Sequence, residues 1–176
     1  NVEEATLEAS RCLNCKNPRC VAACPVNIRI PDFIHQVVEG NFAAAAAVIS
    51  EDSSLPSVCG RVCPQESQCE GKCTRGIKNE PVGIGRLERF VADWHRENVH
   101  TAPVMPESNG HKVAIIGAGP AGLSAACRLN AKGYEVTLFD SKPMPGGLLR
   151  YGIPNFKLDK AVIDRRMGVL EAEGIK

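Results

Sequence analysis

The chain has 176 residues, and 44% of them are apolar, which suits one large or two small folded domains and excludes an intrinsically disordered chain. Its 21 Lys and Arg residues are balanced by 20 Asp and Glu residues, so the composition points neither to nucleic acid nor to a membrane surface as a partner. No stretch approaches 18 consecutive apolar residues, and the amino terminus is acidic where an export signal is basic and then apolar, so we expect a cytoplasmic protein.

The first hundred residues predict an all-helical domain. Apolar residues at helical spacing, with proline or glycine near the ends, predict four helices, at 2–10, 31–39, 42–49 and 84–98. The helix at 84–98 has Leu87, Phe90, Val91 and Trp94 on one face. The stretches between these helices that contain the cysteines, 12–25 and 59–73, show little periodicity and are expected to be loops.

The chain changes character after residue 100. Residues 101–111 contain several Pro, Ser, Asn and Gly residues and predict a linker. Beyond it, a short strand at 113–116, a helix at 121–131 and a strand at 135–139 predict one parallel βαβ unit, and a further amphipathic helix is expected at 158–173. The predicted fold is therefore α plus α/β, with a helical domain at 1–100 and an incomplete Rossmann-like domain at 112–176.

Eight of the nine cysteines fall into two groups of four within the first 73 residues. The first group is Cys12, Cys15, Cys20 and Cys24, and the second is Cys59, Cys63, Cys69 and Cys73. The first group reads C-x2-C-x4-C-x3-C-P, which is close to the bacterial ferredoxin run in which a proline follows the last ligand. The number and spacing of these thiols predict iron-sulfur clusters that carry electrons.

Two other uses of the cysteines remain open at this point. Each group could hold a tetrahedral zinc ion, although only Cys12 and Cys15 have the C-x2-C spacing of a zinc knuckle. Disulfides are typical of small exported domains, and the odd number of cysteines and the acidic amino terminus argue against them. The alternative from a different functional class is therefore a structural zinc-binding interaction domain.

A glycine motif lies between the strand expected at 113–116 and the helix that follows. Residues 117–122 have the dinucleotide-binding pattern G-x-G-x-x-G. Gly117 permits the tight turn, Gly119 lets a pyrophosphate approach the backbone, and Gly122 allows the helix to pack on the strand. Asp140, at the end of the second strand, is placed to accept hydrogen bonds from ribose hydroxyls. The agreement of strand, helix and terminal acid disfavours a glycine-rich turn without a ligand.

The dinucleotide-binding unit is expected to be incomplete. A doubly wound sheet needs more than two strands to bury both of its faces. Residues 174 and 175 resemble the approach to a third strand, and the sequence does not begin with Met. We therefore expect the chain to be a piece of a longer protein whose remainder completes the site.

The cysteine and glycine motifs together resemble the amino-terminal part of the small (beta) subunit of NADPH-dependent glutamate synthase. The resemblance extends to dihydropyrimidine dehydrogenase and to the large subunit of NAD-dependent ferredoxin:NADP oxidoreductase. It spans essentially the whole chain, and the stretches that carry it are 12–15, 20–25, 59–64, 69–73, 83–88, 117–122 and 145–154.

The resemblance implies that ligands from the two cysteine groups are exchanged between two 4Fe-4S clusters. One cluster would be bound by Cys12, Cys15, Cys20 and Cys73. The other would be bound by Cys24, Cys63, Cys69 and the carboxylate of Glu88, which leaves Cys59 as a non-ligand. Such crossing also occurs in two-cluster ferredoxins. Without the resemblance, Glu88 would be interpreted as an exposed acid on a helix surface.

The resemblance also implies that the glycine motif binds FAD. The residues from the motif and the second strand would be Gly117, Ala118, Gly119, Pro120, Ala121, Gly122 and Asp140. Gly146, Gly147, Leu148 and Lys157 would bind the flavin end or its linker. Val62, next to Cys63, would contact FAD from the cluster domain, which would place the cluster that includes Glu88 nearest to the flavin.

The function that follows is the electron-transfer part of an NADPH oxidoreductase, in which electrons pass between FAD and two 4Fe-4S clusters. NADPH would bind to a second dinucleotide-binding domain, and no residue of this chain is expected to act as a general acid or base. The expected partners are the missing carboxy-terminal FAD/NADPH region and a large catalytic subunit or a ferredoxin-type acceptor. A glutamate synthase small subunit is favoured, with a ferredoxin:NADP oxidoreductase or a dihydropyrimidine dehydrogenase relative as the alternative.

Overall fold

The structure, a computed structural model, describes residues 1–99 and 105–176. The chain divides into two compact units, Asn1–His100 and Thr101–Lys176, and each is described here by itself. The linker expected at 101–111 falls partly on residues 100–104, which lie outside the described residues.

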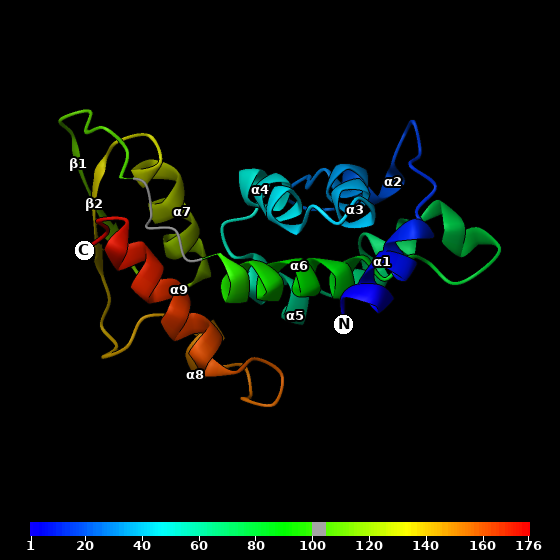
Figure 1. Cartoon of the computed structure of the whole chain (residues 1–176). Helices are drawn as coiled ribbons and strands as arrows, with labels where there is room; N and C mark the ends of the chain where they lie inside the picture. The colour runs from blue at the N-terminus through cyan, green and yellow to red at the C-terminus, as the bar shows by residue number, and fades with distance from the viewer. Residues whose placement is uncertain (100–104) are drawn as a thin grey trace. The chain divides into compact units, whose positions relative to one another are not determined.

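The first unit is helical throughout its described residues (Figure 1). Its α-helices are α1 (Val2–Ser10), α2 (Arg19–Ala22), α3 (Ile30–Val38), α4 (Phe42–Asp52), α5 (Pro56–Val62) and α6 (Ile84–Asn98). Three short 3-10 helices separate α5 from α6, namely η1 (Gln65–Ser67), η2 (Glu70–Lys72) and η3 (Thr74–Ile77). The four helices expected from the sequence are all present, and those at 2–10 and 84–98 have the expected bounds.

The expectation that both cysteine stretches are loops is wrong in part. Cys20 lies in α2, and Cys59 lies in α5, which begins with Pro56 in its first turn. Proline suits that position because its fixed φ is helical and the first amide groups of a helix have no intrahelical acceptor. Neither helix is long enough to display a full apolar period, which is why the sequence pattern did not indicate them.

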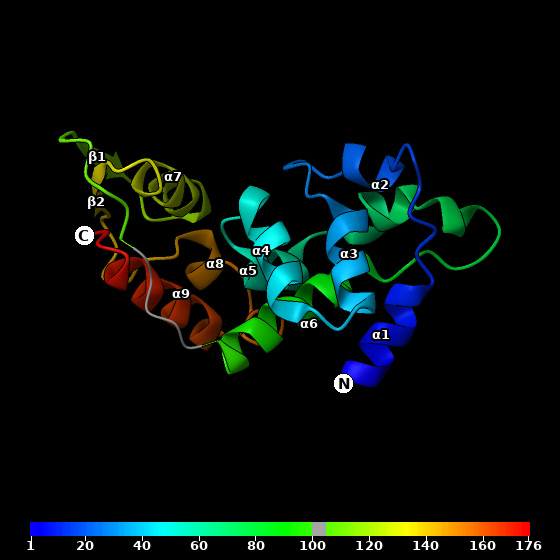
Figure 2. The same ribbon diagram turned by 45° about the horizontal axis from the view of Figure 1, so that its top comes forward.

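The core of the first unit lies between α1, α3, α4 and α6, and Figure 2 shows α3 and α4 side by side. The expected face of α6 is confirmed, with Leu87 and Val91 buried. Phe42 of α4 packs against Phe90 and Trp94 of that face, with ring centroids 5.3 and 5.1 Å apart. Burial of the apolar face of α6 is the main contribution to the free energy that stabilises this helix.

The first turn of α6 is held by two carboxylates from other parts of the first unit. Its N-cap residue, Gly83, has no side chain, so the free backbone N–H groups need outside acceptors. Glu8 of α1 accepts from Gly83 N–H at 2.7 Å, and Glu70 accepts from Gly85 N–H at 2.9 Å. Glu8 also accepts from Arg11 at 2.6 Å. These bonds set the axial position of α6, and therefore of its buried Glu88.

Glu8→Gln is expected to destabilise the first unit by about 1–2 kcal/mol, because the charge-assisted bonds to Gly83 and Arg11 become neutral ones. Partial burial opposes ionisation of Glu8, but the Arg11 hydrogen bond and then the Gly83 N–H outweigh it and lower the pKa. The stabilisation is therefore present above the ordinary value of 4.5 and is lost as the pH falls through the lower folded value. Thermal unfolding at pH 7 measures the loss of stability in Glu8→Gln. The control is Glu3→Gln, on the exposed side of α1. Equal unfolding midpoints for Glu8→Gln and the wild type would contradict the role of Glu8.

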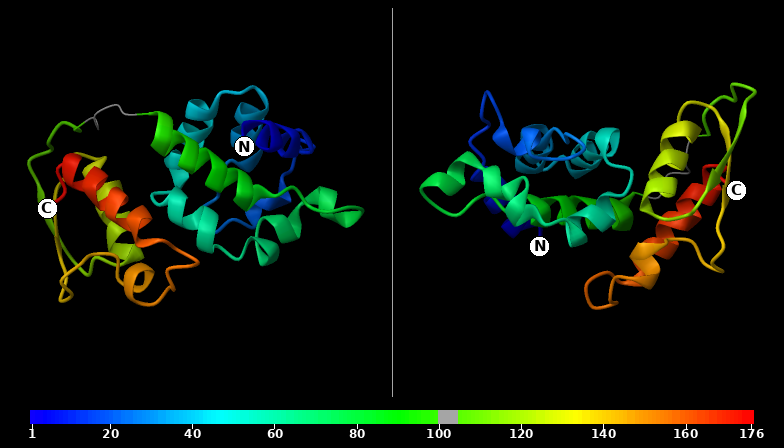
Figure 3. Two further views of the ribbon diagram at one scale, coloured as in Figure 1. Left: turned by 60° about the horizontal axis from the view of Figure 1, so that its bottom comes forward. Right: turned by 180° about the vertical axis from the view of Figure 1, so that it is seen from behind.

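In the described residues 105–176, the second unit contains two parallel strands and three helices. In chain order these are β1 (Lys112–Ile116), α7 (Pro120–Asn130), β2 (Glu135–Phe139), α8 (Leu148–Tyr151) and α9 (Lys160–Ala172). The strands pair in parallel from Lys112 opposite Glu135 to Ile116 opposite Phe139. Figure 3 shows α7 and α9 on the same face of these strands. The predicted βαβ unit is confirmed, and so are the expected core positions Val162, Ile163 and Leu170 of α9.

After α9 the backbone returns to the sheet. Lys176 N–H donates to Val136 O at 3.0 Å, and Leu138 N–H donates to Lys176 O at 2.7 Å, which is the pattern of a parallel ladder on the edge of β2 opposite β1. Residues 105–111 pack against the same unit, where Asn109 N–H donates to Gly133 O at 2.9 Å. Among the helices of residues 1–99 and 105–176, none is long and apolar enough to cross a membrane.

Candidate functional site

Three cysteines from one stretch of the sequence and a distant fourth line one pocket of the first unit. Cys12 follows α1, Cys15 lies in the next loop, Cys20 lies in α2, and Cys73 ends η2. Their pocket is closed on its other sides mainly by apolar side chains, namely Leu13, Pro18, Ile30, Pro31, Ile34, Val82 and Ile84, together with Thr74 and Arg75. The structure thus brings together the four residues expected to share the first cluster, and we call them the first thiol group.

Two thiols of this group, those of Cys12 and Cys20, lie in surroundings that disfavour free thiolates. Burial, followed by the charges of neighbouring thiolates, raises the pKa of Cys12, and the same causes raise the pKa of Cys20 to about 11. Thiols with such pKa values stay protonated at neutral pH unless a cation replaces the protons. Four thiols in a largely apolar pocket therefore suit a soft, positively charged metal group.

A second set of acidic groups lies in the same unit and consists of Cys24, Cys63, Cys69 and Glu88. Cys63 and Cys69 each interact electrostatically with both Cys24 and Glu88, so the structure also brings these four residues together. Burial raises the pKa of Cys69 to about 12. We call this set the mixed group, because a carboxylate takes the place of a fourth thiol.

Glu88 is a buried carboxyl group with an unsatisfied oxygen. Its side chain is 7% exposed on the buried face of α6, and its Oε1 has no hydrogen-bond partner among the residues that the structure describes. Burial, and then electrostatic repulsion from the neighbouring Cys59, raise the pKa of Glu88 to about 8. A buried carboxyl oxygen without a partner costs about 1–3 kcal/mol, so an iron ion at this position would satisfy an otherwise unexplained polar atom.

Cys59 lies beside the mixed group and is not one of its four members. It is one helical turn before Cys63, and the Ser53 hydroxyl donates to its sulfur at 3.8 Å. The hydrogen bond between the two thiols, and then burial, raise the pKa of Cys59, whereas the same bond lowers the pKa of Cys63. The lowered pKa makes Cys63 the better suited of the two thiols to act as a metal ligand.

The glycine motif of the second unit forms a tight loop between β1 and α7. Gly117 has a φ of +102°, and a Cβ at Gly122 would lie 1.9 Å from the Gly117 carbonyl oxygen. A Cβ at Gly147 would lie 2.7 Å from the Gly119 Cα, so the segment with Gly146 and Gly147 packs directly on the motif. No side chain caps the amino terminus of α7, which leaves backbone N–H groups free for an anion such as a pyrophosphate.

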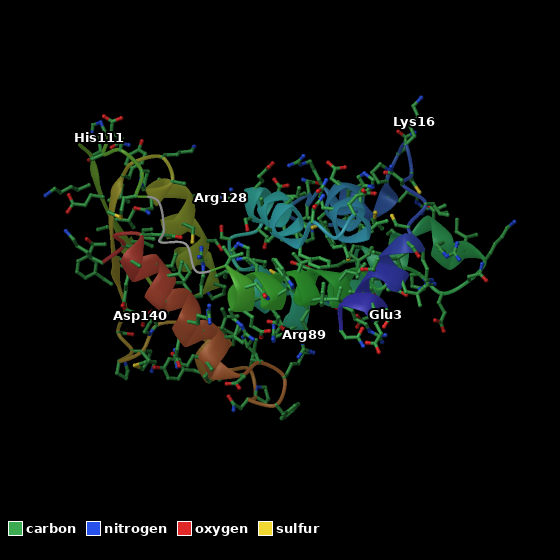
Figure 4. The ribbon with its side chains drawn as sticks, viewed as in Figure 1. Glu3, Lys16, Arg89, His111, Arg128 and Asp140 are labelled. Carbon is green, nitrogen blue, oxygen red and sulfur yellow. The ribbon has the colours of Figure 1, made fainter. Side chains whose placement is uncertain are left out.

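Asp140 closes the end of β2, where Figure 4 labels it. Its two oxygens accept from Lys142 N–H at 2.8 Å and from Ala118 N–H at 2.6 Å. These bonds, with that of Lys142 first, lower the pKa of Asp140. A carboxylate can accept about four hydrogen bonds, so this exposed group keeps capacity for ribose hydroxyls while it also fixes the glycine loop.

The structure places the other expected FAD-binding residues without testing their role. Pro120 and Ala121 begin α7, Gly146 donates to Ala118 O at 2.8 Å, and Leu148 and Lys157 are exposed. Val62 is half-buried at the end of α5 in the first unit. All of them stay predictions.

Two residues in these regions were not indicated by the sequence. Arg75 lines the pocket of the first thiol group, and its position two residues after Cys73 was the available signal. Lys160 donates to the carbonyls of Leu149, Ile153 and Leu158, at distances of 3.0, 2.5 and 3.1 Å, and so ties the loop after α8 to α9. No local pattern marks a lysine that binds carbonyls brought together by the fold.

Comparison with known proteins supports both the cysteine-rich unit and the dinucleotide-binding unit. Residues 1–100 match the family described as dihydropyrimidine dehydrogenase domain II, 4Fe-4S cluster, and residues 115–168 match the NAD(P)-binding Rossmann-like domain. The chain is 43% identical over 171 residues to the NAD-dependent dihydropyrimidine dehydrogenase subunit PreT of Escherichia coli, which covers 97% of this chain and 42% of that protein. It is 44% identical over 175 residues to the glutamate synthase [NADPH] small chain of the same organism, which covers 98% of this chain and 37% of that protein.

The chain spans about two-fifths of the length of these curated relatives. The resemblance drawn from the cysteine and glycine motifs is confirmed by relatives of both names, and the match to the first family covers more than half of the chain. The chain belongs to the family of dihydropyrimidine dehydrogenase domain II, 4Fe-4S cluster.

Proposed function

We propose that this chain is the electron-transfer part of a flavin and iron-sulfur NADPH oxidoreductase, with two 4Fe-4S clusters in the first unit and FAD on the second. The observation that carries the proposal is the single pocket lined by Cys12, Cys15, Cys20 and Cys73. The buried, unsatisfied oxygen of Glu88 beside Cys24, Cys63 and Cys69 supports a second cluster.

The family match favours clusters over the zinc alternative. Residues 1–100 match a family whose description names a 4Fe-4S cluster, and only Cys12 and Cys15 have the C-x2-C spacing of a zinc knuckle. Four thiols that line one pocket suit a group of several iron and sulfide ions. All nine cysteines lie in these described ranges as free thiols, which also argues against disulfides.

The protein side chains supply binding and orientation, and the redox chemistry belongs to the cofactors. When bound, FAD exchanges electron pairs with a nicotinamide and single electrons with clusters. The first thiol group and the mixed group would hold iron, and the α7 amino terminus with its glycine loop would hold the pyrophosphate. Asp140 orients the loop through Ala118 and would accept hydrogen bonds from the ribose. No group of this chain is assigned a proton transfer.

The assignment of FAD to the second unit rests on the resemblance of residues 145–154, since the glycine motif by itself also suits NAD(P). Gly146 and Gly147 support it, because they bring this segment onto the motif. NADPH would then bind in a further domain of the whole protein. A glutamate synthase small subunit is our preferred identity for that protein, with a large catalytic subunit as its partner; a dihydropyrimidine dehydrogenase or ferredoxin:NADP oxidoreductase relative, with another acceptor, is the second candidate.

Anaerobic purification followed by quantification of iron, sulfide, zinc and flavin tests the proposal. We expect brown protein with a broad absorption band at about 400 nm and about eight iron and eight sulfide ions per chain. We also expect FAD either to copurify with the protein or to bind when it is added. Colourless protein that contains zinc would overturn the cluster assignment. Four iron ions per chain would restrict it to the first thiol group.

A further inference from the structure

Arg75 faces the pocket of the first thiol group with an unsatisfied donor. It lines this pocket with the four cysteines, and its Nε is buried without a hydrogen-bond partner in the part of the chain that the structure describes. A buried N–H without an acceptor costs about 1–3 kcal/mol, and more when the group is charged. The thiolates and sulfides of a cluster are the acceptors that this donor lacks.

The charges around the two candidate cluster sites have opposite signs. Cys73 of the first thiol group is an electrostatic neighbour of Arg11, and the same pocket holds Arg75. Arg11 is balanced by Glu8 at 2.6 Å, so the guanidinium of Arg75 is the more effective of the two charges. Cys69 of the mixed group has two carboxylates as neighbours, Glu88 and Glu70. Glu88 is a proposed ligand and carries the same single charge as a thiolate, so Glu70 is the additional negative charge. The first site therefore has the guanidinium of Arg75 in its lining, and the second has a further carboxylate beside it.

We propose that Arg75 is a positioning residue that donates a hydrogen bond to the cluster bound by Cys12, Cys15, Cys20 and Cys73 and raises its reduction potential above that of the cluster bound by the mixed group. The inference rests on the proposed function, since it requires both clusters. With this difference in potential, electrons that reach the site with Glu88 would move on to the site with Arg75.

The sign of the effect follows from electrostatics. Reduction adds one negative charge to a cluster, and a nearby cation or N–H donor stabilises the reduced form more than the oxidised form. A carboxylate does the reverse, and the pocket walls are largely apolar, so solvent screens these interactions weakly. Loss of Arg75 therefore lowers the potential of the first site.

The test is an EPR-monitored redox titration of the anaerobically purified, cluster-loaded protein and of three variants. Arg75→Gln removes the charge and changes the donor, Arg75→Lys keeps the charge but loses the fixed guanidinium fork, and Lys16→Gln is the control. Lys16 neighbours Cys15 in sequence, but its exposed side chain lies at the tip of the loop after α1, away from the helices (Figure 4). The signal that survives in Glu88→Ala identifies the first site.

We expect the midpoint potential of the first site to fall in Arg75→Gln, to fall less in Arg75→Lys and to stay unchanged in Lys16→Gln. The potential of the mixed group should stay within error in all three variants. If Arg75→Gln does not retain the first cluster, the Arg75→Lys titration is the test. A lower midpoint potential of the first site in Arg75→Lys then supports the role of Arg75, and an unchanged potential overturns it. Unchanged potentials in the Arg75 variants, with full iron and sulfide, would overturn this inference alone, whereas a wild-type protein without clusters would overturn the proposed function.

Discussion

Replacement of Glu88 by alanine is expected to remove about half of the iron and sulfide from the protein, from about eight of each per chain to about four. The remaining three ligands of the mixed group, Cys24, Cys63 and Cys69, would leave one iron site without a protein donor. A carboxylate is a harder ligand than a thiolate, so the cluster that it completes is the more labile of the two even in the wild type. The first thiol group does not depend on Glu88 and should keep its cluster and its EPR signal.

Two further variants distinguish loss of a ligand from loss of packing. Glu88→Cys supplies a thiolate at the same position on α6 and should restore the second cluster at least in part, with an altered EPR signal. Glu97→Ala, also on α6, removes an exposed glutamate whose ion pair with Arg96 lies at the surface, and it should change neither content nor signal. Full iron content and an unchanged signal in Glu88→Ala would remove Glu88 from the site.

Replacement of Gly122 by alanine is expected to weaken dinucleotide binding by about 5- to 150-fold, the equivalent of the 1–3 kcal/mol that overpacking costs. The added Cβ would lie 1.9 Å from the carbonyl oxygen of Gly117, so the loop between β1 and α7 must move. That movement also disturbs the Ala118 N–H, which is held by Asp140 at 2.6 Å. The backbone N–H groups at the start of α7 would no longer be arranged around a pyrophosphate.

The matched control is Gly168→Ala in α9, where an added Cβ meets no atom within 4 Å. This change should leave binding intact and stabilise the helix by about 0.5–1 kcal/mol, because alanine has the higher helix propensity. Fluorescence titrations with FAD and with NADPH, run on both variants, measure the affinities. Wild-type FAD affinity in Gly122→Ala would contradict the site, and tight NADPH binding without FAD binding would reassign it to the nicotinamide cofactor.

Local patterns predicted much of the fold. The helices at 2–10 and 84–98 and the strand at 135–139 have the expected bounds, because caps and apolar spacing act over a few residues. The short helices α2 and α5 were missed, since neither has room for a repeating pattern. The glycine loop was predicted with its detailed shape, because the spacing of Gly117, Gly119 and Gly122 is itself the geometric requirement.

The sequence by itself determined that the chain has a helical cysteine-rich unit and a dinucleotide-type βαβ unit, because thiol spacing, helical periodicity and the glycine pattern are local properties. Only the tertiary structure decided which side chains share a pocket. Cys73 joins Cys12, Cys15 and Cys20 across about sixty residues, and Glu88 reaches Cys24, Cys63 and Cys69 because two carboxylates hold the start of α6. The physical reason is that burial of α6 and its capping by distant residues place these ligands, and no spacing within a single stretch encodes such long-range contacts.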